Sequence, residues 1–264
     1  MTLWVVVPAA GLGQRFSQVS DQGSAQGAGH SSIDPDLPQP DLPKPDLPKQ
    51  YHLLNGKALI VHTLERLLAI EPTRVVVAVH PQDKYWRLLP ISDPRLQFVE
   101  GGAERADSVL RALGALVDVA KPDDRVLVHD VARPCVSVKD IKQLIRLAGD
   151  HPAGGILATA LTDTVKRVNS EELILGTEDR GSLWAAMTPQ LSPYGVLVQA
   201  LEHARDKGIK ITDEASALEG IGHKPKVVSA RRDNIKVTYR EDIALAEAIL
   251  RAQDKESGET DHQG

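Results

Sequence analysis

The chain has 264 residues, which is enough for one α/β domain with a sizeable core. Its 31 Lys and Arg residues against 36 Asp and Glu residues give a net charge of -5, so it lacks the basic surface of a nucleic-acid-binding protein, and a local cluster of cations must hold any anionic substrate. The single cysteine, Cys135, excludes an intrachain disulfide and a cysteine-based zinc site, and no apolar run approaches the ~20 residues of a membrane span, so we expect a cytoplasmic protein without a nucleic-acid or membrane partner.

Short runs rich in Val and Ile alternate with amphipathic stretches along most of the chain. Strands are predicted at Leu3–Val7, Val75–Val79, Arg125–Val128 and Ile156–Ala160. Helices are predicted around Ile60–Leu68, Val109–Val117 and Ile141–Ala148, the last behind Ser137 as its N-cap. This alternation is typical of βαβ units, and it predicts an α/β fold with a mostly parallel sheet covered on both faces.

Two segments interrupt the alternation. Residues 17–48 begin rich in Gly, Ser and Gln and end in a tandem Asp-Leu-Pro-x-Pro repeat, which predicts a polyproline-like or disordered insert. Residues 162–186 are polar, with β-like stretches at Thr164–Val168 and Leu173–Leu175, and we interpret them as a projecting arm.

Regular structure is expected again after the arm. Ser192 is predicted to cap a helix with Leu197, Leu201 and Ala204 facing inward, and Thr212-Asp213-Glu214 to open a second helix. Short strands are predicted at Val227–Ala230 and Ile235–Thr238, followed by a C-terminal helix that contains Leu245 and Ile249. We therefore expect a single domain over residues 1–253 and a flexible tail over 254–264, because the tail is rich in charged residues, Gly and Gln.

The loop Pro8–Arg15 follows the first strand and carries small residues that let a backbone approach phosphates closely. No Gly-Lys-Ser/Thr follows, so it is not a Walker A loop, and Phe16 replaces the third glycine of a dinucleotide fingerprint. Taken alone, this loop is better interpreted as an ordinary tight turn. Two cations near it, Arg15 and Lys49, favour a triphosphate ligand.

Three further segments lie where strands are expected to end or to flank a cleft. Gly101–Ser108 suits either a helix start or a loop that recognises a base through backbone groups. Asp130 follows a central strand and is a candidate for a metal-nucleotide contact, with an Asp–Arg pair that ties a loop as the alternative, while His129 is interpreted as structural. Lys236 could enter the cleft or remain solvated.

Together these stretches resemble the 2-C-methyl-D-erythritol 4-phosphate cytidylyltransferase family of non-mevalonate isoprenoid biosynthesis. The matching stretches, in order, are PAAGLGQR, PKQY, GGAERADSV, VLVHDVARP, TDTVKR, DRGSLWAAMTPQ, TDEASALE and DNIKVT. The resemblance implies a Rossmann-like nucleotidyltransferase fold that dimerises through the arm. It also implies CTP and Mg²⁺ as ligands and transfer of CMP from CTP to the sugar-alcohol phosphate, with release of diphosphate.

The resemblance also implies residue roles. Arg15 and Lys49 would stabilise the transition state, and Arg180 and Lys236 would position the acceptor phosphate. The implied substrate-binding residues are Asp130, Arg133, Thr164 and Thr188, with Asp130 also the metal contact. The implied nucleotide-binding residues are Pro8, Ala9, Ala10, Gly11, Leu12, Gly102, Ala103, Arg105, Ser108 and Val131.

Three departures from the family pattern stand out, namely the insert between Arg15 and Lys49, Ala103 where some relatives carry Asp, and Gln14 where some carry a basic residue. None of them removes a charge that the chemistry needs. A ribitol 5-phosphate cytidylyltransferase is the nearest alternative, and a non-catalytic nucleotide-binding protein a remote one. Retention of Arg15, Lys49 and Lys236 together argues against the non-catalytic alternative.

Overall fold

The computed structural model describes residues 2–11, 16 and 47–260, and its centre is a seven-stranded sheet in the order β11-β7-β10-β6-β1-β4-β5. The strands are β1 (Leu3–Ala9), β4 (Arg74–Val79), β5 (Leu96–Glu100), β6 (Arg125–Val128), β7 (Gly155–Ala160), β10 (Trp184–Pro193) and β11 (Lys226–Ser229). All neighbouring pairs are parallel except those of β10, which runs antiparallel to both β6 and β7. The predicted α/β fold with a mostly parallel sheet is therefore confirmed.

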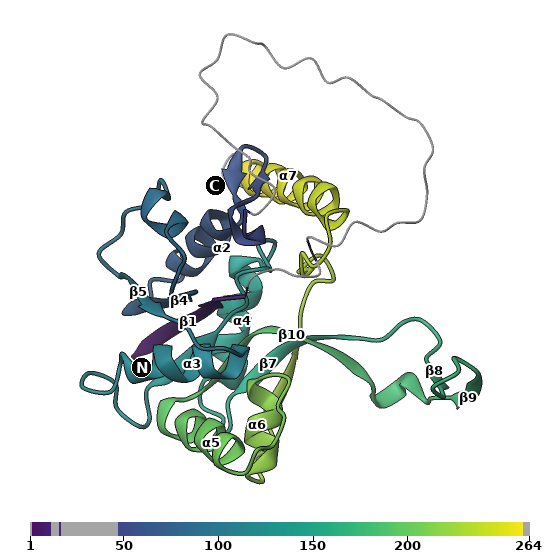
Figure 1. The fold of residues 1–264 in the computed structure, drawn as a ribbon. Coiled ribbons are helices and arrows are strands. Elements are labelled where there is room, and N and C mark those ends of the chain that lie inside the picture. The colour runs from purple at the N-terminus through teal and green to yellow at the C-terminus, as the bar shows by residue number, and fades with distance from the viewer. Residues whose placement is uncertain (1, 12–15, 17–46, 261–264) are drawn as a thin grey trace.

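Helices cover both faces of the sheet (Figure 1). One face packs against α2 (Leu59–Leu68), α4 (Val138–Ala148) and α7 (Asp242–Thr260), and the other against α3 (Arg105–Gly114), α5 (Tyr194–Asp206) and α6 (Glu214–Gly220). Alternate residues of β1 contribute to the two cores, which is why this strand is apolar throughout. The predicted N-cap of α4 is confirmed, since the Ser137 hydroxyl accepts a hydrogen bond from the backbone N–H of Asp140 at 3.0 Å.

A two-stranded hairpin projects from the sheet between β7 and β10, at the place predicted for the arm (Figure 1). It consists of β8 (Lys166–Val168) and β9 (Ile174–Thr177), followed by the short 3-10 helix η3 (Arg180–Ser182). Every residue of the two strands is exposed. The implied role of the arm in dimerisation stays a prediction.

Three local predictions are wrong. Ser192 does not cap a helix, because it lies in β10 and α5 begins only at Tyr194. Residues Ile235–Thr238 do not form a strand. The backbone N–H of Val237 donates to Ala132 O at 2.8 Å, but the segment forms no ladder of backbone hydrogen bonds with a neighbouring strand. Helix α3 ends at Gly114, which leaves the Val117 side chain exposed.

The remaining short elements are η1 (Lys49–Tyr51), β2 (Leu53–Leu54), β3 (Lys57–Ala58) and η2 (Tyr85–Leu88). Helix α7 continues through Thr260, past the point where the tail was predicted to begin. Most of the predicted insert, residues 17–46, lies outside the described residues. Within the described part of the chain, no helix has the length and apolar character needed to cross a membrane.

Candidate active site

An open cleft of about 650 Å³ lies at the edge of the sheet where the parallel strands end. Its walls come from the segments that follow β1, β4, β5 and β6, together with η1 and the segment before α7. The chain runs from β1 outward through β4 and β5, and then returns to β6 on the other side of β1. The cleft therefore lies at a topological switch point of the sheet, which is where open α/β sheets bind their ligands.

The structure brings most of the predicted nucleotide-binding residues to this cleft. Those that line it are Pro8, Ala9, Ala10, Gly11, Gly102, Ala103, Arg105, Ser108 and Val131. The predicted residues Leu12 and Arg15 lie outside the described residues. Gly101 and Glu104, which belong to the predicted base-recognition loop Gly101–Ser108, also line the cleft. The lining residues that had not been assigned to a site are Phe16, Gln50, His80, Pro81, Arg111, Ala132 and Thr238.

The two glycines after β5 are required by close packing. A Cβ on Gly101 would lie 2.5 Å from the Cβ of Ala10, and one on Gly102 would lie 2.2 Å from the Cβ of Asp107. The Ser108 hydroxyl accepts a hydrogen bond from the N–H of Gly102 at 3.1 Å, which fixes the loop against the first turn of α3. Glycine at both positions therefore lets the loop pack closely against Ala10 and Asp107 while it lines the cleft.

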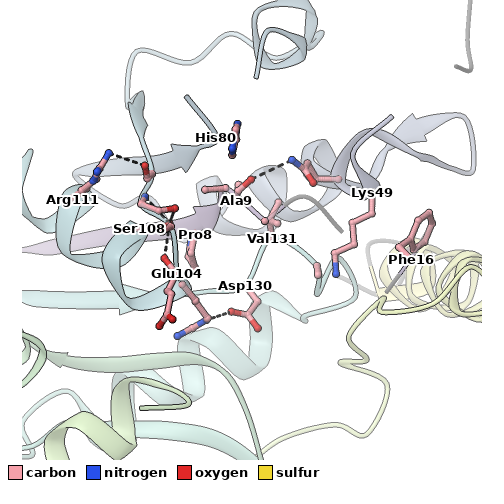
Figure 2. Close-up of a pocket in the computed structure, with 18 of the residues that line it drawn as sticks. Pro8, Ala9, Phe16, Lys49, His80, Glu104, Ser108, Arg111, Asp130 and Val131 are labelled. Carbon is pink, nitrogen blue, oxygen red and sulfur yellow. Dashed lines mark hydrogen bonds and ion pairs between the residues drawn. The ribbon is translucent and has the colours of Figure 1, made fainter. Parts of the chain in front are cut away.

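Lys49 is presented by η1, on the opposite side of the cleft from Ser108 and Arg111 (Figure 2). Its ammonium group donates to the backbone oxygen of Val237 at 2.9 Å. The next residue, Gln50, is buried and donates from its amide to Ala9 O at 3.2 Å, which ties η1 to the end of β1. Lys49 therefore lies beside both the small-residue loop and the segment that carries Lys236.

Asp130 lies in the floor of the cleft with a cation on each oxygen. Arg105 Nε is 2.9 Å from its Oδ1, and Lys236 Nζ is 2.8 Å from its Oδ2. Burial opposes ionisation of this carboxyl, but the charges of Arg105 and Lys236 outweigh it and hold its pKa below the usual range. Lys236 therefore lies in the cleft, which is one of the two positions that the sequence left open. It is not on a strand, however.

The donor set around Asp130 does not form a preformed magnesium site. Among residues 2–11, 16 and 47–260, no group of three or more His, Cys, Asp or Glu side chains is placed to hold a metal ion. Two carboxylates line the cleft, Glu104 and Asp130, and Asp130 is already paired with two cations. A Mg²⁺ ion in this cleft would have to bring most of its oxygen ligands with it, as a nucleotide-bound ion does.

Three predicted residues lie behind the floor of the cleft. His129 is fully buried, and its pKa is lowered to about 4, chiefly by burial. It contacts the hydroxyl of Thr188 at 3.1 Å, and that hydroxyl also accepts the N–H of Asp130 at 3.0 Å. Arg133 donates to Asn234 O at 2.7 Å. These residues hold the strand end and the Lys236 segment together, which fits the structural interpretation of His129.

The two predicted arm residues do not line the cleft of their own chain. Thr164 lies in the exposed segment before β8. Arg180 begins η3, is exposed, and donates to the backbone oxygen of Thr162. The described part of one chain therefore supplies a cleft with the cations Lys49, Arg105, Arg111 and Lys236, but without Arg180 of the arm.

The fold and the cleft place the chain in the class of α/β proteins with an open, mostly parallel sheet and a ligand cleft at its switch point, here lined by glycines and cationic side chains. The family model of 2-C-methyl-D-erythritol 4-phosphate cytidylyltransferase, IspD, matches residues 43–252. The chain belongs to this family, and it is therefore a cytidylyltransferase.

Relatives and solved structures agree with this assignment. A protein of that name from Vibrio vulnificus (strain YJ016) is 45% identical over 251 residues, which cover 94% of this chain and 94% of the relative. One from Chromohalobacter salexigens is 43% identical and covers 94% of this chain and 89% of the relative. The crystal structure of the Francisella tularensis enzyme is 33% identical, with a TM-score of 0.74, over 94% of this chain and 100% of that one. The structure of the Thermus thermophilus enzyme is 27% identical, with a TM-score of 0.71, over 95% of this chain and 100% of that one.

Proposed function

We propose that this chain transfers CMP from CTP to 2-C-methyl-D-erythritol 4-phosphate, giving 4-diphosphocytidyl-2-C-methyl-D-erythritol and diphosphate in isoprenoid biosynthesis. The observation that carries the proposal is the match to this family over nearly the whole chain, with identities of 43% and 45% to named relatives. The cytoplasm, where CTP is made, is the compartment that we propose for the reaction.

The reaction requires little proton transfer by the protein. An oxygen of the acceptor phosphate attacks the α-phosphorus of CTP, a new P–O bond forms, and the bond to the β-phosphate oxygen breaks to release diphosphate. The acceptor phosphate is already an anion near neutral pH, so no general base is needed. The protein must bring two anions together and stabilise the extra charge at the α-phosphate, for which cations and positioned donors suffice.

Different cations of the cleft are assigned to different phosphates. Lys49, beside the small-residue loop, is assigned to the α-phosphate, and Arg15 is proposed as its partner. Lys236, which rests on Asp130, is assigned to the acceptor phosphate. Support for this division comes from the hydrogen bond of Lys49 to Val237 O, since it brings the two lysine-bearing segments together.

The nucleotide is assigned to the loops after β1 and β5, because both loops line the cleft and consist largely of small residues. Mg²⁺ is proposed to enter as the Mg·CTP complex, held mainly by the phosphates, because the described residues offer no cluster of ligands for it. When bound, the ion neutralises part of the phosphate charge. The protein's own cations then hold the reacting phosphates in place.

We assign the arm to a homodimer in which Thr164 and Arg180 complete the site of the partner subunit. The arm carries four exposed apolar side chains close together in sequence, Val168, Leu173, Ile174 and Leu175. Exposed apolar clusters of this kind mark interaction surfaces. Burial of this surface against a second copy would also bring Arg180 to a cleft that lacks it.

The test is diphosphate release from CTP, measured with 2-C-methyl-D-erythritol 4-phosphate and with ribitol 5-phosphate as separate acceptors. The proposal expects turnover with the first and at most a small fraction of that rate with the second. Faster turnover with ribitol 5-phosphate would reassign the acceptor. CTP binding without diphosphate release from either acceptor would favour a non-catalytic role.

A further inference from the structure

Glu214 is a charged side chain in an unexpected place. It is the first residue of α6 and only 1% exposed, and it does not line the cleft. An ionised carboxylate is almost never buried so completely without a charged or hydrogen-bonding partner, because its removal from water is costly. Its contacts therefore indicate what it does.

The partner of Glu214 is Arg105, in the first turn of α3. Arg105 Nη1 lies 2.6 Å from Oε1 and Nη2 lies 3.0 Å from Oε2 of Glu214, so both arms of the guanidinium are engaged. The third donor, Nε, points to Asp130 Oδ1 at 2.9 Å, and the other oxygen of Asp130 holds Lys236 at 2.8 Å. The four side chains form a row of alternating charge that runs from the interior into the cleft.

This row has an interior end and a cleft end. Arg105, Asp130 and Lys236 line the cleft, whereas Glu214 reaches it only through the guanidinium of Arg105. A planar guanidinium held at three donors has one orientation, and a two-point contact with a carboxylate is the strongest way to fix it. A buried ion pair is poor evidence of added stability, since apolar side chains of similar volume often serve as well. The ion pair between Glu214 and Arg105 instead sets the direction in which Arg105 Nε points.

The need for that orientation follows from the charge on Asp130. In the free protein, Asp130 is compensated by Arg105 and by Lys236. If Lys236 turns to a substrate phosphate, Asp130 loses one of its two cations while a further anion arrives nearby. Arg105 is then the cation that remains on Asp130, and it remains aligned only if Glu214 holds it.

We propose that Glu214 is a positioning residue for the reaction: it fixes Arg105 against Asp130 so that Lys236 can exchange Asp130 for the acceptor phosphate. The inference rests on the proposed function and deepens it, since it names a buried residue on which the cleft cations depend. It concerns the acceptor side of the cleft and requires no contact between Glu214 and either substrate.

The test compares Glu214→Gln with Glu219→Gln, a matched control at an exposed position of the same helix. Gln keeps the shape of Glu214 but turns an N–H₂ group toward the N–H donors of Arg105, so the two-point contact is lost. Steady-state diphosphate release is measured at a temperature where circular dichroism shows all variants folded. We expect kcat of Glu214→Gln to fall about 10- to 100-fold, as for a displaced catalytic group, with Glu219→Gln unchanged. A kcat equal to wild type in folded Glu214→Gln overturns the proposal.

A second comparison separates positioning from a general loss of structure. Arg105→Gln removes the group through which Glu214 acts, so adding Glu214→Gln to it should change kcat by less than about twofold. A further large loss in the double variant would mean that Glu214 acts by another route, and would overturn the proposal. The double variant removes both charges of the buried pair together, so this comparison carries the test even if Glu214→Gln alone does not fold.

Failure of this inference and failure of the proposed function are distinguishable. If the wild-type protein releases no diphosphate from CTP with 2-C-methyl-D-erythritol 4-phosphate, the function itself fails. If wild type is active and Glu214→Gln matches it, only the positioning role fails.

Discussion

Gly102→Ala is a sharp test of the proposed nucleotide-binding role of the loop after β5, because the structure gives the size of the perturbation. The added methyl group would lie 2.2 Å from the Cβ of Asp107, 3.1 Å from its carbonyl carbon and 3.2 Å from its Cα. No rotation of a side chain relieves a clash with Cβ and backbone atoms, so the loop or the first turn of α3 must move. Overpacking of this kind typically costs about 1–3 kcal/mol, and a shift of about 1 Å in a positioning group can cost up to ~100-fold in rate.

We therefore expect Gly102→Ala to lower the free energy of unfolding by about 1–3 kcal/mol. We also expect it to lower kcat/KM for CTP by about 10- to 100-fold. Urea titration and initial rates of diphosphate release measure the two effects. Gly114→Ala is the control, because an added Cβ at this last residue of α3 meets no atom within 4 Å. Wild-type stability together with wild-type kcat/KM in Gly102→Ala would contradict this expectation.

Three further predictions concern the cations and the insert. Lys49→Ala and Arg15→Ala should each lower kcat at least ~100-fold with a smaller effect on CTP binding, because each removes a preorganised charge; wild-type turnover in either would contradict the assignment. Arg180 should act in trans, so a Lys49→Ala subunit mixed with an Arg180→Ala subunit should regain activity in dimers with one intact site; if subunits exchange and no activity returns, Arg180 serves its own subunit. Deletion of Gln18–Pro43 should preserve kcat and KM for CTP, because a loop's closure entropy changes by only ~0.6 kcal/mol per doubling of its length, whereas a large rise in KM would show that the insert assists CTP binding.

The sheet centre is predictable from sequence because its strands are buried on both faces. Val5, Val6 and Val7 face alternate cores, and none of them is exposed, so the run is apolar at every position. The same pattern in β4 and β6 locates the strand ends. Because strands of a parallel sheet end at the same edge, the approximate position of the cleft follows from these runs.

Strand β10 could not be predicted in this way. It contains two prolines and the polar residues Thr188, Gln190 and Ser192, a composition that argues against a central strand. The structure accommodates the strand with a register irregularity between Ala186 and Gln190. The Gln190 amide also bonds to Asp213 Oδ2 at 2.8 Å and accepts the N–H of Ala215 at 2.8 Å. These compensating contacts come from α6 and its N-cap, far along the chain, and no local pattern contains them.

The candidate site, like the fold, was predictable only in part. The predicted strand end singled out Asp130, and an expected short strand singled out Lys236, whereas Arg105 was implied only by the family resemblance. Their mutual pairing was not predictable, since it joins three segments that meet only in the fold. Glu214 was interpreted only as part of a helix start, because its partner Arg105 is 109 positions away.

Diphosphate release from CTP by the wild-type protein with 2-C-methyl-D-erythritol 4-phosphate, compared with ribitol 5-phosphate, tests the central claim most directly. We expect release that depends on the methylerythritol acceptor and on Mg²⁺, with an amount of cytidylylated product equal to the diphosphate formed. Preference for ribitol 5-phosphate, or release of diphosphate without a cytidylylated acceptor, would contradict it.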